Sequence, residues 1–283
     1  MHRGAGNRKS LGRPALVAPL ARAFRAVNPL ALPILRFALA CLLSVATNPT
    51  AVRAAEPRPP ERTVVPRETR DVSGWQVHIH RKLLEAEAED TARALAGLKK
   101  MLDEIVRELP APAVTELRKV PLYFSPAYQP DRSGAEFHPD AGWLRANGRD
   151  PAMARGVEFS GVHDFEAEMR RMPNFALHEL AHAYHHRVLA DGFENAAVKA
   201  AYDRAKAAGS YERVERSFGE GNGRANTFER AYALTSPMEY FAETTEAYFT
   251  RNDFFPFTRA ELKQHDPELF TLLETLWGVP ATK

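Results

Sequence analysis

Cysteine is almost absent from this sequence. Cys41 is the one cysteine among 283 residues, and it lies in the N-terminal stretch 1–55. The rest of the chain therefore folds without disulfide bonds, which is permissible for a domain of this size even after export. With 45% hydrophobic residues, the chain can bury one good core without such cross-links.

Acidic residues are absent from the first 55 residues, which hold eight basic ones. An apolar run follows at 29–46, interrupted by Arg36, and small residues at Ala46 and at 54–55 offer cleavage sites. This pattern predicts that residues 1–55 are a signal peptide or N-terminal leader, and that the protein is exported, either secreted or periplasmic. Because Arg36 interrupts the run, an uncleaved N-terminal membrane anchor is the weaker alternative.

The positive charge of the chain belongs to this leader. Of the 38 Lys and Arg residues, eight lie in the leader, and the remaining 30 stand against 36 Asp and Glu, a net charge of −6. The composition therefore predicts no nucleic-acid partner. A membrane partner is expected only if the leader stays uncleaved.

Beyond the leader, composition and periodicity divide the chain. Residues 56–74 are rich in Pro and Arg and predict an extended linker. A phosphate-binding loop is excluded at the glycine-rich stretch 219–223, since no strand precedes it and no Gly-Lys-Ser/Thr follows. Alternation and helical periodicity predict strands at 75–80, 120–124 and 156–160, and helices at 82–109 and 195–208.

Histidine is uncommon, with ten in the chain, yet two of them occur in His178-Glu179-Leu180-Ala181-His182. Histidines four apart on a helix project from one face. Both imidazoles then reach one tetrahedral Zn²⁺ at roughly 2.0–2.1 Å. Glu179 can act as general base on the metal-bound water. The apolar flanks predict a buried helix over about 165–189; the alternative is a surface helix with an unrelated glutamate.

A catalytic zinc usually takes three protein ligands. A third histidine in the metzincin pattern is excluded, because His185 and Val188 stand where that pattern has Gly and His. A second helix starting at Pro237, with Ser236 as N-cap, offers a glutamate instead. Its carboxylates share one face, and the alternative is a solvated acidic face; they are Glu239, Glu243 and Glu246.

The His178–His182 motif, together with the run from Tyr232 to Glu243, resembles the catalytic domain of anthrax toxin lethal factor and its bacterial relatives. These are zinc metallopeptidases that use a glutamate as third ligand. The resemblance covers about residues 165–278. It implies that Glu239 completes the zinc site and that Tyr232, seven residues earlier, faces the substrate oxyanion. The segment between the two zinc helices differs in length and composition, so substrate specificity does not carry over.

The resemblance implies a fold as well. We expect an α+β, zincin-like metallopeptidase domain over residues 75–283, mainly helical, with a small sheet above the active-site helix. By analogy with zincins, strand 156–160 is the candidate for the edge that binds the substrate backbone. Glu243 is expected to accept a hydrogen bond from a ligand histidine, Glu246 to be salt-bridged or solvent-facing, and His185 to lie near the cleft wall.

The function expected is that of a zinc-dependent endopeptidase acting on a peptide or protein substrate. Zn²⁺ is held by His178, His182 and Glu239, Glu179 is the general base, and Tyr232 donates to the oxyanion. Two alternatives stay open: a catalytically silent binding protein on a zincin scaffold, and a zinc hydrolase of a non-peptide amide. The presence of Glu179 argues against the first, since a structural metal site has no need of a general base.

Overall fold

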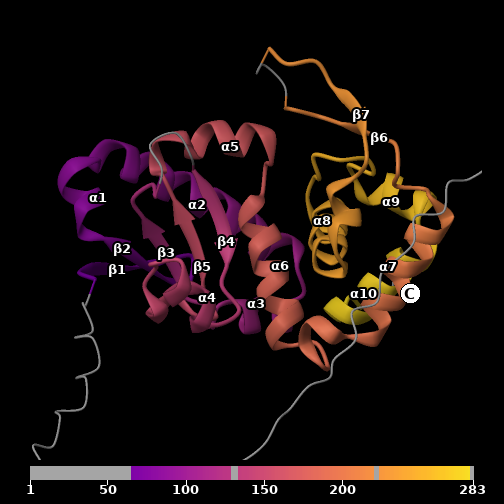
Figure 1. Ribbon diagram of the computed structural model, residues 1–283, viewed down its shortest axis with the longest axis horizontal. Coiled ribbons are helices and arrows are strands. Elements are labelled where there is room, and N and C mark those ends of the chain that lie inside the picture. The colour runs from indigo at the N-terminus through magenta and orange to yellow at the C-terminus, as the bar shows by residue number, and fades with distance from the viewer. Residues whose placement is uncertain (1–64, 129–132, 220–222, 281–283) are drawn as a thin grey trace, which may run out of the picture. The chain divides into compact units, whose positions relative to one another are not determined.

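The computed structural model describes residues 65–128, 133–219 and 223–280, all within one unit of the chain, Pro60–Lys283. The predicted leader, residues 1–55, lies outside the described residues. Helices and short strands alternate along the first half, and helices predominate in the second (Figure 1).

Within the described residues the helices and strands follow one another in this order: β1 Arg67–Val72, β2 Trp75–His80, α1 Arg81–Ala86, α2 Ala88–Glu108, α3 Ala111–Leu117, β3 Leu122–Ser125, β4 Gly134–Phe137, α4 Ala141–Ala146, β5 Val157–Ser160, α5 Phe165–Arg171, α6 Phe175–Arg187, α7 Ala196–Ala208, β6 Val214–Arg216, β7 Thr227–Glu229, α8 Pro237–Phe249, α9 Arg259–His265 and α10 Pro267–Trp277. Four 3₁₀ turns connect some of them: η1 Pro151–Met153, η2 Val162–Asp164, η3 Gly192–Glu194 and η4 Tyr232–Thr235.

Five of the strands form one mixed sheet in the order β1-β2-β3-β5-β4. The central strands β2, β3 and β5 run parallel, and β1 and β4 pair antiparallel at the two edges. Alternation in β2 buries Trp75, Val77 and Ile79 completely, as expected for a strand whose one face meets the core. The separate hairpin β6–β7 makes a second, two-stranded sheet.

Strand β1 lies inside the stretch 56–74 that composition assigns to a linker. Its six residues pair in register with β2, from Arg67 opposite His80 to Val72 opposite Trp75. The four residues Glu68–Asp71 are all exposed, and five of the six side chains from Arg67 to Val72 are polar or charged. Such an edge strand lacks the apolar alternation by which strands are predicted from sequence. The structure nevertheless places residues 67–72 in the sheet, paired with β2.

Two long predicted helices are each divided in the structure. The helix expected over 82–109 is interrupted at Glu87, which separates α1 from α2. The helix expected over 165–189 is interrupted around Pro173, which separates α5 from α6. Proline lacks the N–H that a helix interior requires. Asn174 then starts α6 as its N-cap, and its side chain accepts a hydrogen bond from the Leu177 N–H at 3.0 Å.

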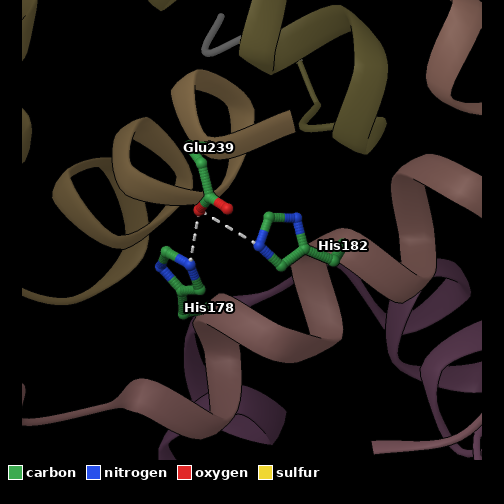
Figure 2. Close-up of side chains that lie close together, drawn as sticks. All are labelled: His178, His182 and Glu239. Carbon is green, nitrogen blue, oxygen red and sulfur yellow. Dashed lines mark hydrogen bonds and ion pairs between the residues drawn. The ribbon is translucent and has the colours of Figure 1, made fainter. Parts of the chain in front are cut away.

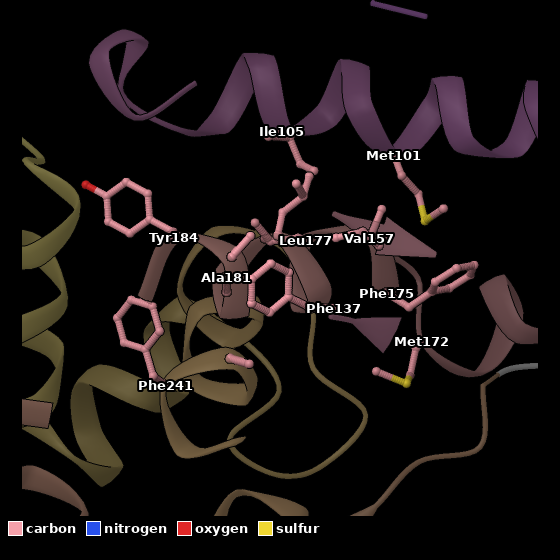
Figure 3. Close-up of a cluster of buried hydrophobic side chains, with 14 of the residues drawn as sticks. Met101, Ile105, Phe137, Val157, Met172, Phe175, Leu177, Ala181, Tyr184 and Phe241 are labelled. Atoms are coloured by element: carbon pink, nitrogen blue, oxygen red, sulfur yellow. The ribbon is translucent and has the colours of Figure 1, made fainter. Parts of the chain in front are cut away.

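Helix α6 lies between the sheet and the C-terminal helices, in contact with β4, α2 and α8 (Figure 1). Figure 3 shows Ile105 and Met101 of α2 pointing into the main core, with Ile105 next to Leu177 of α6. On its other side, Tyr184 stacks on Trp277 of α10 with ring centroids 4.0 Å apart. Ten of the thirteen residues of α6 are buried, so packing around the helix fixes the positions of its polar side chains.

The fold is thus mixed α and β, largely helical with a small sheet, as the sequence predicts at that level. The zincin assignment is finer than this description and stays a prediction. Within the part of the chain that the structure describes, no helix has both the length and the apolar character needed to cross a membrane.

Candidate metal centre

Helices α6 and α8 bring three potential metal ligands together. His178 and His182 project from one face of α6, and Glu239 reaches them from the first turn of α8 (Figure 2). One oxygen of Glu239, Oε2, lies 3.1 Å from Nε2 of His178 and 3.3 Å from Nε2 of His182. The sequence prediction that these three residues meet at one point agrees with this arrangement.

The start of α8 determines where Glu239 lies. Ser236 is the N-cap, and its hydroxyl accepts a hydrogen bond from the Glu239 N–H at 3.2 Å. Pro237 occupies the first helical turn, where its missing N–H has no cost. Glu239 is therefore held in the first turn, where the helix dipole favours a carboxylate.

Two of the separations between the three ligand atoms fit a tetrahedral cation. Two ligands each about 2.05 Å from a tetrahedral zinc are about 3.3 Å apart, and the two observed separations from Glu239 Oε2 are 3.1 and 3.3 Å. All three ligand atoms lie within 4.8 Å of one another. Two imidazoles and a carboxylate are also a donor set that a divalent metal of this size accepts.

Buried charge is balanced within this triangle. Burial alone would lower the pKa of His178, but the hydrogen bonds that it donates to Glu239 and Glu246 outweigh burial and hold the pKa well above its ordinary value. Burial would likewise raise the pKa of Glu239, and hydrogen bonds from His178 and His182 hold it well below its ordinary range. The protons on the two imidazoles therefore occupy the place that a cation would take beside Glu239, and they would leave when the histidines bind a metal.

The carboxylate that orients His178 is Glu246, which corrects the expectation for Glu243. Glu246 Oε1 accepts a hydrogen bond from Nδ1 of His178 at 2.7 Å, whereas Glu243 Oε1 is 3.7 Å away. Glu246 was expected to be salt-bridged or solvent-facing, and the structure shows the first: it is completely buried and forms an ion pair with His178. The two residues are close to one helical turn apart, and only the position of α6 decides which of them meets the imidazole.

Glu179 points toward the edge of the sheet. Its Oε2 accepts a hydrogen bond from the backbone N–H of Phe137 in β4 at 2.7 Å. Strand β4 is the end of the sheet beside α6, whereas β5 is paired on both sides. The expectation that residues 156–160 form the edge above the active-site helix is therefore wrong, and β4, Gly134–Phe137, is that edge. No apolar alternation marks the sequence Gly-Ala-Glu-Phe as a strand.

A cavity of about 360 Å³ opens beside these residues, and it is called the metal-side cavity below. His178, Glu179 and Tyr232 all line it. Tyr232 stands at the start of η4 with 47% of its surface exposed. Burial and the charge of Glu239 raise the pKa of Tyr232, so its hydroxyl stays protonated and able to donate.

Several charged residues of this cavity have no counterpart in the sequence analysis. Asp253 is 2% exposed and accepts hydrogen bonds from Arg171 at 2.9 Å and Arg216 at 3.4 Å. These residues come from three separate segments and carry no spacing signal. Arg171 directly precedes the break between α5 and α6, and that break was not predicted either.

His185 is buried away from the metal-side cavity, which differs from its expected place at the cleft wall. Its side chain is completely buried, and neither ring nitrogen has a hydrogen-bond partner. The ring lies 5.3 Å from Phe193 and 5.0 Å from Phe241. Apolar surroundings of this kind disfavour the charged imidazolium.

Comparison with known proteins agrees with the chemistry of the centre. Residues 159–277 match a family model described as Glucose-regulated metallo-peptidase M90. The matched range includes α6 and α8, and with them His178, Glu179, His182 and Glu239. No curated protein and no solved structure matches the chain. The match supports a metallopeptidase, a class of hydrolase that uses a divalent cation, typically zinc.

Proposed function

We propose that the chain is a zinc-dependent endopeptidase that hydrolyses peptide bonds, with His178, His182 and Glu239 as the zinc ligands. The observation that carries the proposal is the convergence of both Nε2 atoms on one oxygen of Glu239, at 3.1 and 3.3 Å. A glutamate from a second helix, with a tyrosine seven residues before it, also resembles the pattern of the lethal factor family. The match to a metallopeptidase family model supports the same class.

A zinc ion bound here supplies Lewis-acid polarisation of a water and of the scissile carbonyl. Glu179 takes the proton of the attacking water and later delivers it to the leaving amine. Because Oε2 of Glu179 accepts the Phe137 N–H, we assign the proton transfer to Oε1. Tyr232 donates its hydroxyl hydrogen bond to the oxyanion of the tetrahedral intermediate. Glu246 fixes the orientation of His178 through its Nδ1 hydrogen bond.

The substrate backbone is proposed to pair with β4. This strand ends the sheet next to α6, and its residues Gly134 and Ala135 line the metal-side cavity. An extended peptide added to this edge would pass over His178 and Glu179, as strand addition requires. Export is a separate proposal, supported by the basic start, the apolar run and the small residues of the predicted leader.

The decisive experiment compares the metal-loaded chain with Glu179→Gln on a broad peptide library, with and without a chelator. We expect the wild type to cleave, the chelator to abolish cleavage, and Glu179→Gln to keep the metal but lose cleavage by several orders of magnitude. A wild type that cleaves no peptide, yet binds a protein partner as well as Glu179→Gln does, would support a scaffold protein. If the wild type cleaves non-peptide amides but no peptide, the chain is instead a zinc hydrolase of a non-peptide amide.

A further inference from the structure

Two cavities meet at the first residues of β4. Gly134 and Ala135 line the metal-side cavity and also a second cavity of about 370 Å³. The second cavity is called the outer cavity here, and its other walls include Tyr128, Glu136, Trp143, Arg149 and Ser160. None of these five walls belongs to the metal centre, so the outer cavity is a separate feature of the same strand.

The two cavities lie on opposite faces of the sheet. Phe137 of β4 points to the face covered by α6, where its ring lies 5.6 Å from His186. Side chains alternate along a strand, so Glu136 points to the other face. Glu136 is paired with Glu158 of β5 in register, and paired residues project from the same face. The outer cavity is on this face, opposite α6.

The backbone of β4 also alternates between its partner and its free edge. The His138 N–H bonds to Gly156 O at 3.0 Å, on the side of β5. Hydrogen-bonded and non-hydrogen-bonded positions alternate in an antiparallel pair, so Ala135 and Phe137 direct their backbone groups outward. The hydrogen bond from the Phe137 N–H to Glu179 agrees with this direction. A peptide paired with this edge would send successive side chains alternately into the two cavities.

The outer cavity already holds one guanidinium group. Arg149 lies over the ring of Tyr128 at 4.4 Å and over that of Trp143 at 4.9 Å. It pairs with Glu136 and, at 3.2 Å, with Glu158. Two carboxylates therefore surround one guanidinium. Tyr128 and Trp143 keep 47% and 44% of their surface exposed, and exposed aromatic rings of this size are typical of binding surfaces.

Glu158 is a buried carboxylate beneath this group. It is 1% exposed and bonded by His138 at 2.9 Å and by the Tyr128 hydroxyl at 2.6 Å. Burial would raise the pKa of Glu158, but hydrogen bonds led by that of His138 hold it below its ordinary value. Arg149 can keep its ion pair with Glu158 while Glu136, whose side chain is 48% exposed, forms an ion pair with a second cation.

We propose that the outer cavity is a subsite for a basic side chain, Lys or Arg, of an extended peptide paired with β4. The second cation would share the exposed ring of Trp143 and the carboxylate of Glu136. An acidic side chain would meet like charge from Glu136 instead. The proposal rests on the proposed peptidase function, and it adds a substrate class to it.

The test varies one peptide position at a time among Lys, norleucine and Glu, and compares kcat/KM for the full chain and its variants. We expect the wild type to prefer Lys over norleucine at one position. Glu136→Gln should reduce that ratio about two- to fivefold, the value of one exposed ion pair, because the ring of Trp143 is still present. Glu136→Lys should turn the preference toward Glu. Glu89→Gln, an exposed acid on α2, is the matched control and should leave the ratio unchanged.

The outcomes separate this proposal from the peptidase proposal. Cleavage without a preference for Lys at any position, or a preference that survives Glu136→Lys, overturns the subsite and leaves the peptidase standing. If no peptide is cleaved, binding of the Lys peptides to Glu179→Gln is measured, and weaker binding after adding Glu136→Gln supports the subsite alone. If the peptides are neither cleaved nor bound, the subsite proposal and the peptidase proposal are both overturned. Thermal melting of each variant checks the fold, and if Glu136→Lys unfolds, Glu136→Gln decides.

Discussion

Glu246 accepts the hydrogen bond of His178 Nδ1 at 2.7 Å from inside the core, two helical turns beyond Glu239 on α8. The two glutamates thereby hold opposite nitrogens of one imidazole, since Glu239 approaches Nε2 at 3.1 Å. This arrangement fixes both the tautomer and the orientation of His178, because a histidine ligand that donates its second N–H to a carboxylate cannot turn.

The first prediction concerns this hydrogen bond. Glu246→Gln should weaken metal affinity by about ten- to a hundredfold, as is typical for residues that orient a metal ligand. Glu243→Gln is the matched control, because it removes a carboxylate at the same depth whose oxygen is 3.7 Å from the same nitrogen. Competition with a chromophoric chelator measures both. A larger loss in Glu243→Gln than in Glu246→Gln would return the orienting role to Glu243.

The second prediction concerns the ligands. The purified chain should bind close to one zinc, and Glu239→Ala should release most of it, because two imidazoles alone leave the tetrahedral set incomplete. Metal analysis after dialysis measures the content, and His163→Ala, a change at an exposed histidine, is the control. Full occupancy in Glu239→Ala would show that another carboxylate is the third ligand.

The local motifs of the centre were predictable from the sequence, and the tertiary relations around it were not. His178 and His182 are four residues apart on one helix, and Ser236, Pro237 and Glu239 carry the signals of a helix start. Spacing within a helix is fixed by helix geometry alone. These residues therefore lie where the sequence places them.

The sequence predicts less well the roles of residues whose positions depend on how helices pack against each other. Glu243 and Glu246 both face α6 from α8, and a shift of α8 by one turn would exchange their roles. Strand β4 was missed because Gly134–Phe137 is four residues long and its exposed edge carries no apolar alternation. Strand β1 was missed for the same reason. Edges of sheets follow from pairing, which a single sequence does not display.

The third prediction concerns the oxyanion. Tyr232→Phe should keep the zinc content and the fold, because the side chain is 47% exposed at the rim of the cavity. It should lower kcat by about 10²–10³-fold, the effect of removing one oxyanion donor. Steady-state kinetics on a cleaved peptide, with metal analysis of the same sample, measures this. An unchanged kcat would assign Tyr232 to the cavity wall.

The fourth prediction concerns the leader. Expression of the full chain in a bacterium should give an exported species whose N-terminus lies between about residues 47 and 56, after the small residues that end the apolar run. Edman sequencing or mass spectrometry of the periplasmic fraction and the medium measures the cleavage site. Replacing Leu42 and Leu43 by Arg should retain the chain in the cytosol. An intact wild-type chain found only in the cytosol would contradict export.

The last prediction concerns His185, whose buried ring has no hydrogen-bond partner. Burial, together with the charges of His182 and His186, lowers its pKa from the ordinary histidine value to about 4. The native state therefore keeps the ring neutral, whereas the unfolded chain takes up a proton below about pH 6.5. Stability should fall as the pH drops from about 6.5 to about 4, by up to about 3 kcal/mol from this residue.

His185→Leu removes that proton uptake and two unsatisfied polar atoms while nearly keeping the volume. The variant should be more stable than the wild type at pH 7, by about 1–2 kcal/mol, and the difference should grow between pH 6.5 and 4. Urea unfolding at several pH values, with a chelator present so that metal loss does not contribute, measures both. His163→Leu, at an exposed position with 41% of its side chain accessible, should change neither the stability at pH 7 nor its dependence on pH. If His185→Leu is instead destabilised equally at every pH, then the imidazole nitrogens are bound in solution, and a buried water is the partner to look for.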